Sequence, residues 1–496
     1  MRRTLSIAII VAAVATVMVP GVSQAETPTA IKWSDCPADV AKGVPMPEGM
    51  QCGTLKVPLD HRDPDGKQID IAVSRLASKK PEQRRGVLLT NPGGPSSGLG
   101  YPAFLVATGL PKSVLDSYDV IGFDPRGIGR STPVTCDLTV AQLVDGNIPP
   151  YARNAADVAK RAAESKKLAE QCASSKTASM LPFLSTANTA RDMDKIRAAL
   201  GEEKASYAGA SWGTHLGALY TTLFPDRSDR IVLDSNLDKG GWDYASDRLW
   251  SQGVEDRFPD FAKYVAANHR EYGLGWTPAQ VRSKYLELGA RLDKKPVESP
   301  DGTFDGKLFR QITFGFLYGA PQMPVLASVW KSLDANQAPP PLPGGDDAAA
   351  GAENLVSGRY YIICNDSSWP KSLATYQRNV AIDRIKYPLF GAAGANVQPC
   401  AYWPKAIEKP VQVTDEGPSN VLMVQNLRDP ATPLAGALGL RKAFGDRAVM
   451  VTADQGGHGV YPMGKNQCAN HAVTQFLVKG ERPARDYHCT AAAEPR

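Results

Sequence analysis

The chain has 496 residues, of which 43% are hydrophobic and 22% are charged. These values are typical of globular proteins and exclude a chain that is largely disordered. The formal net charge is only +5, which excludes the concentrated positive charge that marks nucleic-acid-binding proteins. The length suffices for one large domain with an insertion or for two ordinary domains.

The N-terminal residues have the features of a secretory signal peptide. Arg2 and Arg3 precede the apolar run 5–19, and the sequence SQA at 23–25 has small residues where a signal peptidase cuts. A membrane anchor is the alternative, but the apolar run is short for a spanning helix. We therefore expect residues 1–25 to be removed and the protein to be secreted into the extracellular space, with no membrane contact afterwards.

The first half of the chain alternates between short apolar runs and helix-like segments. Residues 54–60 and 69–75 predict a hairpin around the turn sequence DPDG. Helices are predicted at 154–173 and 188–200. Further apolar runs have the pattern of strands buried on both faces: 86–91, 118–124, 205–209 and 230–234. This alternation predicts an α/β fold with a mostly parallel sheet flanked by helices.

The alternation stops near residue 240. Helices are predicted at 244–270 and 277–294, and strand patterns resume only at 420–426 and 447–452. We therefore expect three parts after the signal peptide. They are a first part of the core (26–239), a mainly helical cap insertion (240–410) and a second part of the core (411–496).

A serine flanked by glycines follows the predicted strand 205–209. Gly209, Ser211 and Gly213 have the spacing of a sharp turn from a strand into a helix, in which only glycine fits beside the strained serine. Such a turn lifts a hydroxyl above the sheet at a helix N-terminus, where the helix dipole favours negative charge. Ser211 is therefore the candidate nucleophile, and a serine in an ordinary glycine-rich turn is the alternative.

A serine nucleophile needs a base, and six histidines are available. His215 follows Ser211 on the same helix and cannot face its hydroxyl. His458 lies in the glycine-rich loop DQGGHG directly after the buried strand 447–452. We therefore expect His458 to be the base, with a surface loop histidine as the alternative.

The base needs an orienting acid. Asp429 follows the strand 420–426, at the carboxyl end where sites gather in open α/β sheets. Asp454 is the rival acid, but it shares a short loop with His458, and Asp429 could instead cap the next helix. The chain order of Ser211, Asp429 and His458 is that of the α/β-hydrolases.

Acyl transfer also needs donors for the oxyanion. The backbone N–H of Trp212, directly after the nucleophile, is one candidate. The loop NPGGPSSG after the strand 86–91 offers the other, from Gly94 or Gly93. No metal and no organic cofactor is expected in this chemistry.

The eight cysteines are even in number, as expected of disulfides in an exported protein. No CxxC sequence is present, which argues against a zinc site. We expect neighbours in the chain to pair, although sequence alone does not fix the connectivity: Cys36 with Cys52, Cys136 with Cys172, Cys364 with Cys400, and Cys468 with Cys489.

Taken together, several stretches make the chain resemble the secreted tripeptidyl aminopeptidase branch of the proline iminopeptidase-like α/β-hydrolases, of actinobacterial type. One departure is Ser96, where the family usually has another glycine in the oxyanion loop. The resemblance covers most of the mature chain and rests on VPLDHRDPDG (57–66), NPGGPSSG (91–98), DVIGFDPRGIGRSTPVTC (119–136), GASWGTHLGALYTTLFPDR (209–227), YYIICNDSSWP (360–370), QPCAYWP (398–404), LRDPATP (427–433) and GGHG (456–459).

The resemblance implies an α/β-hydrolase fold with a cap over the sheet. It also implies release of tripeptides, or tetrapeptides, from the free N-termini of oligopeptides, often with proline before the cleaved bond. Ser211, Asp429 and His458 match the family triad. We expect a monomer that acts on such peptides.

A site that reads a free N-terminus needs a buried carboxylate to pair with the substrate ammonium. Asp366 is the favoured candidate, with Asp238 and Asp243 as the others, although each could be a helix cap or a surface acid. A proline-sized pocket could be lined by Trp242, Trp369 and Trp403, although aromatic residues are more often part of the core.

Three functions remain open at this point. A secreted serine exopeptidase is the leading hypothesis. An esterase or lipase of the same fold shares the triad and the oxyanion donors, so the acyl pocket must separate the two. A non-catalytic binding protein is the third, but such proteins usually lose a triad residue.

Overall fold

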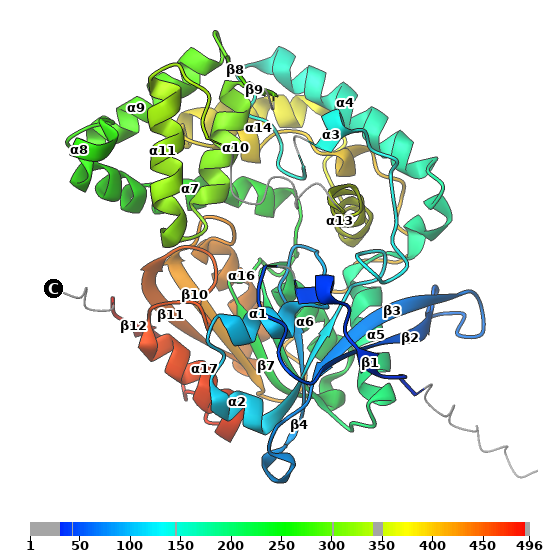
Figure 1. The fold of residues 1–496 in the computed structure, drawn as a ribbon. Coiled ribbons are helices and arrows are strands. Elements are labelled where there is room, and N and C mark those ends of the chain that lie inside the picture. The colour runs from blue at the N-terminus through cyan, green and yellow to red at the C-terminus, as the bar shows by residue number, and fades with distance from the viewer. Residues whose placement is uncertain (1–29, 42, 144–145, 300–301, 341–350, 492–496) are drawn as a thin grey trace, which may run out of the picture.

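The computed structural model describes residues 30–41, 43–143, 146–299, 302–340 and 351–491. The predicted signal peptide, 1–25, lies outside the described residues. A ten-stranded sheet forms the centre, in the order β1-β2-β3-β5-β4-β6-β7-β10-β11-β12 (Figure 1). Its strands are β1 (Ser34–Asp35), β2 (Met50–Pro58), β3 (Gln68–Leu76), β4 (Gly86–Asn91), β5 (Tyr118–Phe123), β6 (Ala205–Ala210), β7 (Ser228–Asp234), β10 (Val421–Arg428), β11 (Ala448–Gly456) and β12 (Tyr487–Cys489).

The sheet is antiparallel at its first edge and parallel elsewhere. The antiparallel pairs are β1 with β2, β2 with β3, and β3 with β5. The pair of β2 and β3 is the predicted hairpin. Every pairing from β5 through β4 to β12 is parallel. The carboxyl ends of the parallel strands therefore meet at one edge, where catalytic loops gather in this class of fold.

Neighbouring residues of the central strands face opposite sides of the sheet, because side chains alternate along a strand. Leu89 and Leu233 belong to one buried cluster, and Leu88 and Val232 belong to another. The first cluster is covered by α5 (Thr186–Ala199), α6 (Trp212–Leu223) and α16 (Leu434–Phe444). The second is covered by α1 (Tyr101–Ala107), α2 (Lys112–Ser117) and α17 (Gln467–Lys479).

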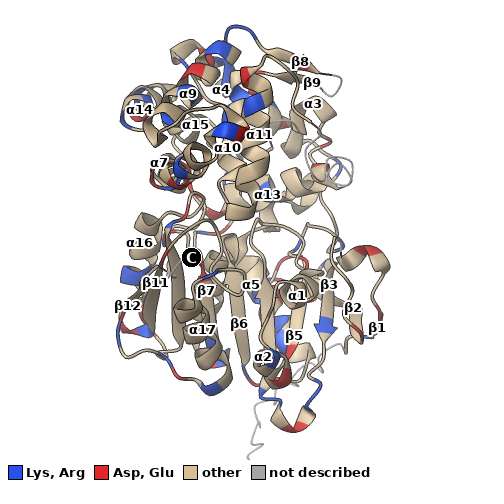
Figure 2. Cartoon of the chain, turned by 60° about the vertical axis from the view of Figure 1, so that its left-hand side comes forward, with Lys and Arg blue, Asp and Glu red and all other residues tan. Residues whose placement is uncertain are grey.

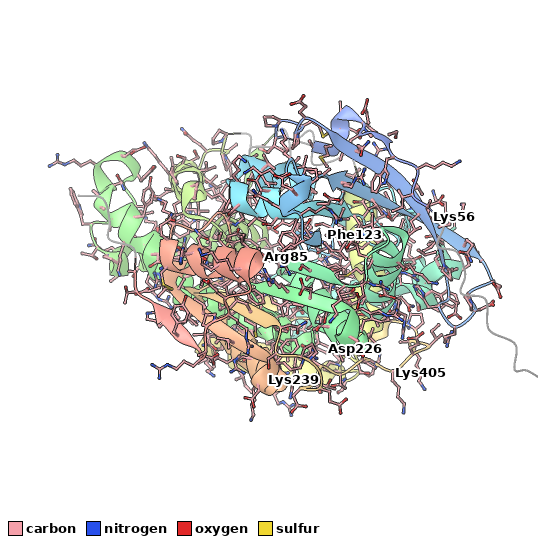
Figure 3. All side chains as sticks on the ribbon, turned by 90° about the horizontal axis from the view of Figure 1, so that it is seen from below. Lys56, Arg85, Phe123, Asp226, Lys239 and Lys405 are labelled. Atoms are coloured by element: carbon pink, nitrogen blue, oxygen red, sulfur yellow. A yellow bond between two sulfur atoms is a disulfide. The ribbon has the colours of Figure 1, made fainter. Side chains whose placement is uncertain are left out.

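A view from below shows an apolar side chain in the interior and charged side chains at the surface (Figure 3). Phe123, at the end of β5, lies in the interior and is 0% exposed, whereas Lys56 and Lys405 extend outward.

A helical cap lies above the carboxyl edge of the sheet (Figures 1 and 2). It has an aromatic core of its own, in which Phe258, Tyr285, Phe309 and Trp330 pack against one another. Acidic and basic residues are interspersed over both layers (Figure 2). The cap contains the small hairpin β8 (Val297–Ser299) and β9 (Gly302–Phe304), and the helices α7 (Tyr244–Ala267), α8 (His269–Tyr272), α9 (Pro278–Leu292), α10 (Gly306–Phe316), α11 (Met323–Asp334), α13 (Ala352–Asp366), α14 (Leu373–Lys386) and α15 (Gly391–Gly394).

The cap also contains a segment that the sequence analysis assigned to the core. α3 (Val140–Leu143) and α4 (Ala155–Ala173) come before residue 240, yet α4 packs against α14 and the short helix η6 (Pro399–Tyr402) (Figure 1). The predicted helix 154–173 thus forms, but above the sheet and not on its flank. The remaining short helices are η1 (Ala38–Ala41), η2 (Pro81–Gln83), η3 (Ala178–Phe183), η4 (Pro225–Arg227), η5 (Ala320–Gln322) and η7 (Gly445–Arg447).

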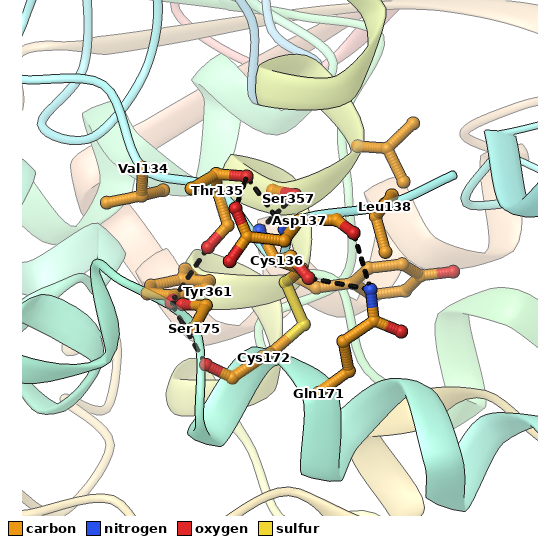
Figure 4. Close-up of a disulfide and its surroundings, with 12 residues drawn as sticks. Val134, Thr135, Cys136, Asp137, Leu138, Gln171, Cys172, Ser175, Ser357 and Tyr361 are labelled. Carbon is orange, nitrogen blue, oxygen red and sulfur yellow. Dashed lines mark hydrogen bonds between the residues drawn. A yellow bond between two sulfur atoms is a disulfide. The ribbon is translucent and has the colours of Figure 1, made fainter. Parts of the chain in front are cut away.

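Four disulfides pair the cysteines as neighbours in the chain, the connectivity expected from the sequence. They are Cys36–Cys52, Cys136–Cys172, Cys364–Cys400 and Cys468–Cys489. The second ties the segment after β5 to the end of α4 (Figure 4), where Gln171 Nε2 donates to the carbonyls of Cys136 at 2.9 Å and Asp137 at 2.7 Å. Within the described residues, no helix combines the length and the apolar character needed to cross a bilayer.

Candidate active site

The predicted nucleophile lies on a strained turn between β6 and α6. Ser211 has a φ of 58° and a ψ of −125°, a left-handed conformation that is rare for a residue with a side chain. Its backbone N–H donates to the carbonyl of Asp234 at 3.0 Å. A Cβ at Gly209 would lie 2.6 Å from the carbonyl oxygen of Gly213, so glycine at 209 lets strand and helix approach this closely.

The loop after β4 packs directly against this turn. A Cβ at Gly93 would lie 2.7 Å from the Cβ of Ser211 and 3.1 Å from the amide nitrogen of Trp212. Gly93 and Gly94 have φ values of 91° and 110°, which favour glycine. The Gly93 N–H donates to Asn91 Oδ1 at 2.8 Å, whereas the Gly94 N–H has no acceptor among the described residues. The Gly94 N–H therefore remains available as an oxyanion donor, whereas that of Gly93 already has an acceptor.

The predicted base and acid are hydrogen-bonded to each other. His458 Nδ1 lies 2.9 Å from Asp429 Oδ2 and 3.1 Å from Oδ1. Asp429 is 1% exposed and accepts bonds from the amides of Ala431 and Thr432 at 2.8 and 2.9 Å. These bonds fix the carboxylate in the orientation that holds Nδ1 and leaves Nε2 for the nucleophile.

The rival acid has a different partner. Asp454 Oδ1 accepts from Arg428 Nη1 at 2.6 Å, and Arg428 Nε also donates to Asp260 at 2.9 Å. The structure thus brings Asp429, and not Asp454, to His458.

A second buried acid supports the histidine loop. Asp234, at the end of β7, accepts from the amides of Val460 and Tyr461, at 2.9 and 2.7 Å for the nearest oxygens. Burial raises the pKa of Asp234 to about 6, against the opposing effect of these bonds. Asp234 was not predicted from the sequence, although it has the same pattern that indicated Asp429, an acid at the carboxyl end of a strand.

The cap completes the support of the imidazole. The backbone carbonyl of Tyr318 accepts a hydrogen bond from the backbone N–H of His458 at 2.7 Å. The two side-chain rings meet edge to face, with their centroids 5.0 Å apart. Burial lowers the pKa of His458, but the charge and hydrogen bond of Asp429, with a contribution from Asp234, outweigh that effect and raise the pKa above its ordinary value. The imidazole is therefore a stronger base than a free histidine.

Ser211 and His458 line one cavity of about 280 Å³ between the sheet and the cap. The Ser211 hydroxyl makes no hydrogen bond with the described residues, and a bond between nucleophile and base commonly tightens only when substrate is present. The remaining lining residues are Pro92, Gly94, Ser96, Asn147, Ile148, Trp212, Leu237, Trp242, Ser246, Trp250, Phe314, Tyr318, Arg359, Ala431 and Thr432.

The three acids expected to bind a substrate ammonium lie elsewhere. Asp366 and Asp243 line a separate cavity of about 320 Å³, which does not contain Ser211. Asp238 accepts from the amide of Lys239 at 2.7 Å and lines neither cavity. The geometry therefore gives no support to an amine-binding role for these three acids.

Asp366 instead lies behind the nucleophile turn. It accepts from the Thr186 N–H at 2.8 Å and from the Thr186 hydroxyl at 2.6 Å, and that hydroxyl accepts from the indole N–H of Trp212 at 3.0 Å. Burial raises the pKa of Asp366 to about 7.

Asp247 similarly holds an aromatic residue of the cavity. It accepts from the indole N–H of Trp242 and from Gln398 Nε2, both at 2.7 Å. No local pattern pointed to Asp247, because Gln398 is distant in the chain and Trp242 lies before the helix that carries Asp247. The described residues contain no cluster of three or more His, Cys, Asp or Glu side chains arranged to hold a metal ion.

The chain is similar to known proteins over most of its length. Residues 387–489 match the model of a family described as TAP-like protein. The chain is similar to the tripeptidyl aminopeptidase of Streptomyces lividans, with 35% identity covering 94% of this chain and 88% of that protein. It is also similar to the serine protease Hip1 of Mycobacterium tuberculosis, with 28% identity covering 92% and 91% of the two chains. Carboxylesterase B of Mycobacterium tuberculosis is 29% identical, covering 92% of this chain and 89% of that one.

Proposed function

Because this chain belongs to the family of the tripeptidyl aminopeptidases within the α/β-hydrolases, we propose that it cleaves oligopeptides through an acyl-enzyme on Ser211 and releases tripeptides from their N-terminal ends. Family membership makes the protein a serine hydrolase of the peptidase class. One observation supports the assignment of the catalytic residues. His458 lines the same cavity as Ser211, and its Nδ1 lies 2.9 Å from Asp429 Oδ2.

The proposed reaction follows from the positions of these groups. His458 Nε2 takes the proton of the Ser211 hydroxyl as the oxygen attacks the scissile carbonyl. The amides of Gly94 and Trp212 stabilise the oxyanion, and Asp429 stabilises the imidazolium. The imidazolium then protonates the leaving amine. Water, activated by the same imidazole, hydrolyses the acyl-enzyme and releases the short peptide.

The size of the cavity supports action on short peptides. A volume of about 280 Å³ is slightly below the range of ordinary small-molecule sites. The cap helices enclose it from above. A space of this size is suited to a few residues of an extended peptide.

The cysteine pairing supports export. Four disulfides and no free cysteine in the described residues are typical of proteins that fold in oxidising compartments. We therefore propose that the mature protein acts outside the cytoplasm after loss of its predicted signal peptide.

The test is mass spectrometry of the products from one defined decapeptide, with its N-terminus free or acetylated. We expect the tripeptide from the free peptide, slower cleavage of the acetylated one, and no product from Ser211→Ala. Peptides with proline or alanine at the third position test the proline preference. Cleavage at internal bonds regardless of acetylation would show an endopeptidase instead.

An esterase is the second candidate, favoured by one observation. The cavity is rich in apolar and aromatic side chains, and among the described residues no carboxylate lines it. A relative 29% identical to this chain is named carboxylesterase B. Turnover of p-nitrophenyl acyl esters with no hydrolysis of any peptide would favour this function.

A further inference from the structure

One charged side chain in the Ser211 cavity has no role in the proposed chemistry. Arg359, on α13, lines the cavity with Ser211 and His458. Its Nε donates to the carbonyl of Pro95 at 3.1 Å. Among the described residues, the two terminal nitrogens of this guanidinium have neither a hydrogen bond nor an ion pair.

Two buried arginines elsewhere in the protein, Arg126 and Arg310, form ion pairs. Arg126 lies 2.6 Å from Asp192, Arg310 lies 3.0 Å from Asp293, and each guanidinium also donates to backbone carbonyls. This is the usual arrangement, because an unpaired buried charge is costly. Arg359 differs from them in lining the cavity that receives the substrate.

The surroundings of Arg359 make its charge dominant in the cavity. Burial lowers the pKa of Arg359, and the phenols of Tyr318 and Tyr360 offset only part of that effect. A guanidinium nevertheless remains charged in proteins. Aromatic side chains, including Trp242, Phe314 and Tyr318, line the same cavity. Such apolar neighbours strengthen the attraction of the guanidinium for an anion.

We propose that Arg359 binds a carboxylate of the peptide substrate and makes the enzyme select acidic peptides. The inference rests on the proposed peptidase function and adds a specificity to it. The bond to Pro95 holds the guanidinium beside the loop that carries Gly94, and Arg359 lines the same cavity as Ser211. A planar fork of donors binds a carboxylate through two parallel bonds. The carboxylate comes from an acidic side chain on the acyl part or from the free C-terminus of the leaving part.

The first experiment separates these two sources with the purified full-length protein. Tripeptide p-nitroanilides carry Glu or Gln at each of the three positions in turn. Tetra-alanine with a free or an amidated C-terminus tests the leaving part. We expect kcat/KM to favour the acidic member of one pair by about 10- to 100-fold, the effect of a charge-assisted hydrogen bond. Whichever pair responds identifies the source.

Variants of Arg359 connect the preference to the guanidinium. Arg359→Gln should reduce the preferred ratio to about 1, and Arg359→Glu should reverse it in favour of a Lys-containing peptide. Arg248→Gln is the matched control, because Arg248 binds Asp383 within the cap and does not line the cavity. We expect its ratio to equal that of the wild type.

A purely structural role gives a different result. If Arg359 only braces Pro95, Arg359→Gln lowers kcat for all peptides alike and leaves every ratio unchanged. That result, or a wild-type ratio near 1 in every pair, overturns the proposal.

A binding readout separates this proposal from the peptidase assignment. Tripeptide amides and tetra-alanine, in the same acidic and neutral pairs, compete with a fluorophosphonate probe for Ser211, and this needs no peptide hydrolysis. Stronger protection by the acidic member, lost in Arg359→Gln, supports the carboxylate site even in an enzyme that cleaves no peptide. Equal protection within every pair overturns the site, whatever the enzyme cleaves.

Discussion

Helix α6 contributes to two cavities of similar size that differ in their charged groups. Ser211 and Trp212 at its start line the cavity of about 280 Å³, whose charged side chain is Arg359. His215 and Leu219, further along the helix, line the cavity of about 320 Å³. That second cavity also contains Asp243, Asp366, Glu408, Lys239 and Lys409.

The comparison distinguishes the cavity that we propose to be reactive from one that is richer in titratable groups. In the second cavity burial favours neutral forms, since it raises the pKa of Asp366 to about 7 and lowers that of His215 to about 4. In the first, the pKa of His458 is raised because a carboxylate and a fixed hydrogen bond compensate its burial. In the proposed mechanism, reactivity depends on this pairing and on the strained serine more than on the number of ionisable side chains.

The largest expected effect is the difference in kcat between replacing a serine of the first cavity and replacing one of the second. Ser211→Ala should lower kcat by about 10⁶-fold, the typical effect of losing a serine nucleophile. Ser367→Ala, in the second cavity, should leave kcat within about twofold, as is usual away from a reaction centre. Circular dichroism checks that both fold, and full activity of Ser211→Ala would refute the nucleophile assignment.

The next largest effect is expected from a change of Asp429, the buried acid beside His458. Asp429→Asn should lower kcat by about 10⁴-fold, because the imidazole loses the carboxylate that orients it. Because the wild-type His458 pKa is raised, kcat/KM should increase with pH through a midpoint above 6.5, as the imidazole loses its proton. Asp429→Asn should move that midpoint to lower pH.

The matched change in the other cavity is Asp366→Asn. Its kcat/KM should stay within about threefold of the wild type, since the carboxylate contacts the site only through Thr186 and Trp212. A loss comparable with that of Asp429→Asn would contradict the separation of the two cavities.

A smaller effect tests the aromatic wall of the first cavity. Asp247→Leu removes the acceptor for Trp242 and should raise KM by about 3- to 10-fold with little change in kcat, the effect of loosening one side chain. Asp247→Asn keeps an acceptor and should raise KM less. A fall in kcat with KM unchanged would mean that Trp242 does not contact bound substrate.

The smallest effect concerns stability and its pH dependence. In the native state burial raises the pKa of Asp366 to about 7, whereas an ordinary aspartate has a pKa near 3.8. Between these values the native state binds more protons, so this group lowers the free energy of unfolding as pH rises. Asp366→Asn should remove this slope, worth roughly 1 to 4 kcal/mol. Urea denaturation at pH 5 and pH 7.5 measures the free energy of unfolding at each pH. The same change between the two pH values in the wild type and in Asp366→Asn would contradict the burial argument.

Much of the framework could be predicted because it depends on local patterns. Apolar runs marked the buried strands, and the glycines around Ser211 marked a turn that sterics allow in few other ways. The cap was predicted at 240–410, but α4 lies in it as well. A helix's apolar face shows that it packs on something and does not show on which layer.

The sequence by itself determined the glycine turn at Ser211, the succession of serine, aspartate and histidine, and the cysteines able to close short loops, because each depends on neighbouring residues. Only the tertiary structure decided that Asp366 belongs to a different cavity from Ser211 and that Arg359 shares one with it. Both depend on how α13 packs against loops more than a hundred residues away in the chain. Burial and charge pairing arise only in that packing, so no local pattern contains them.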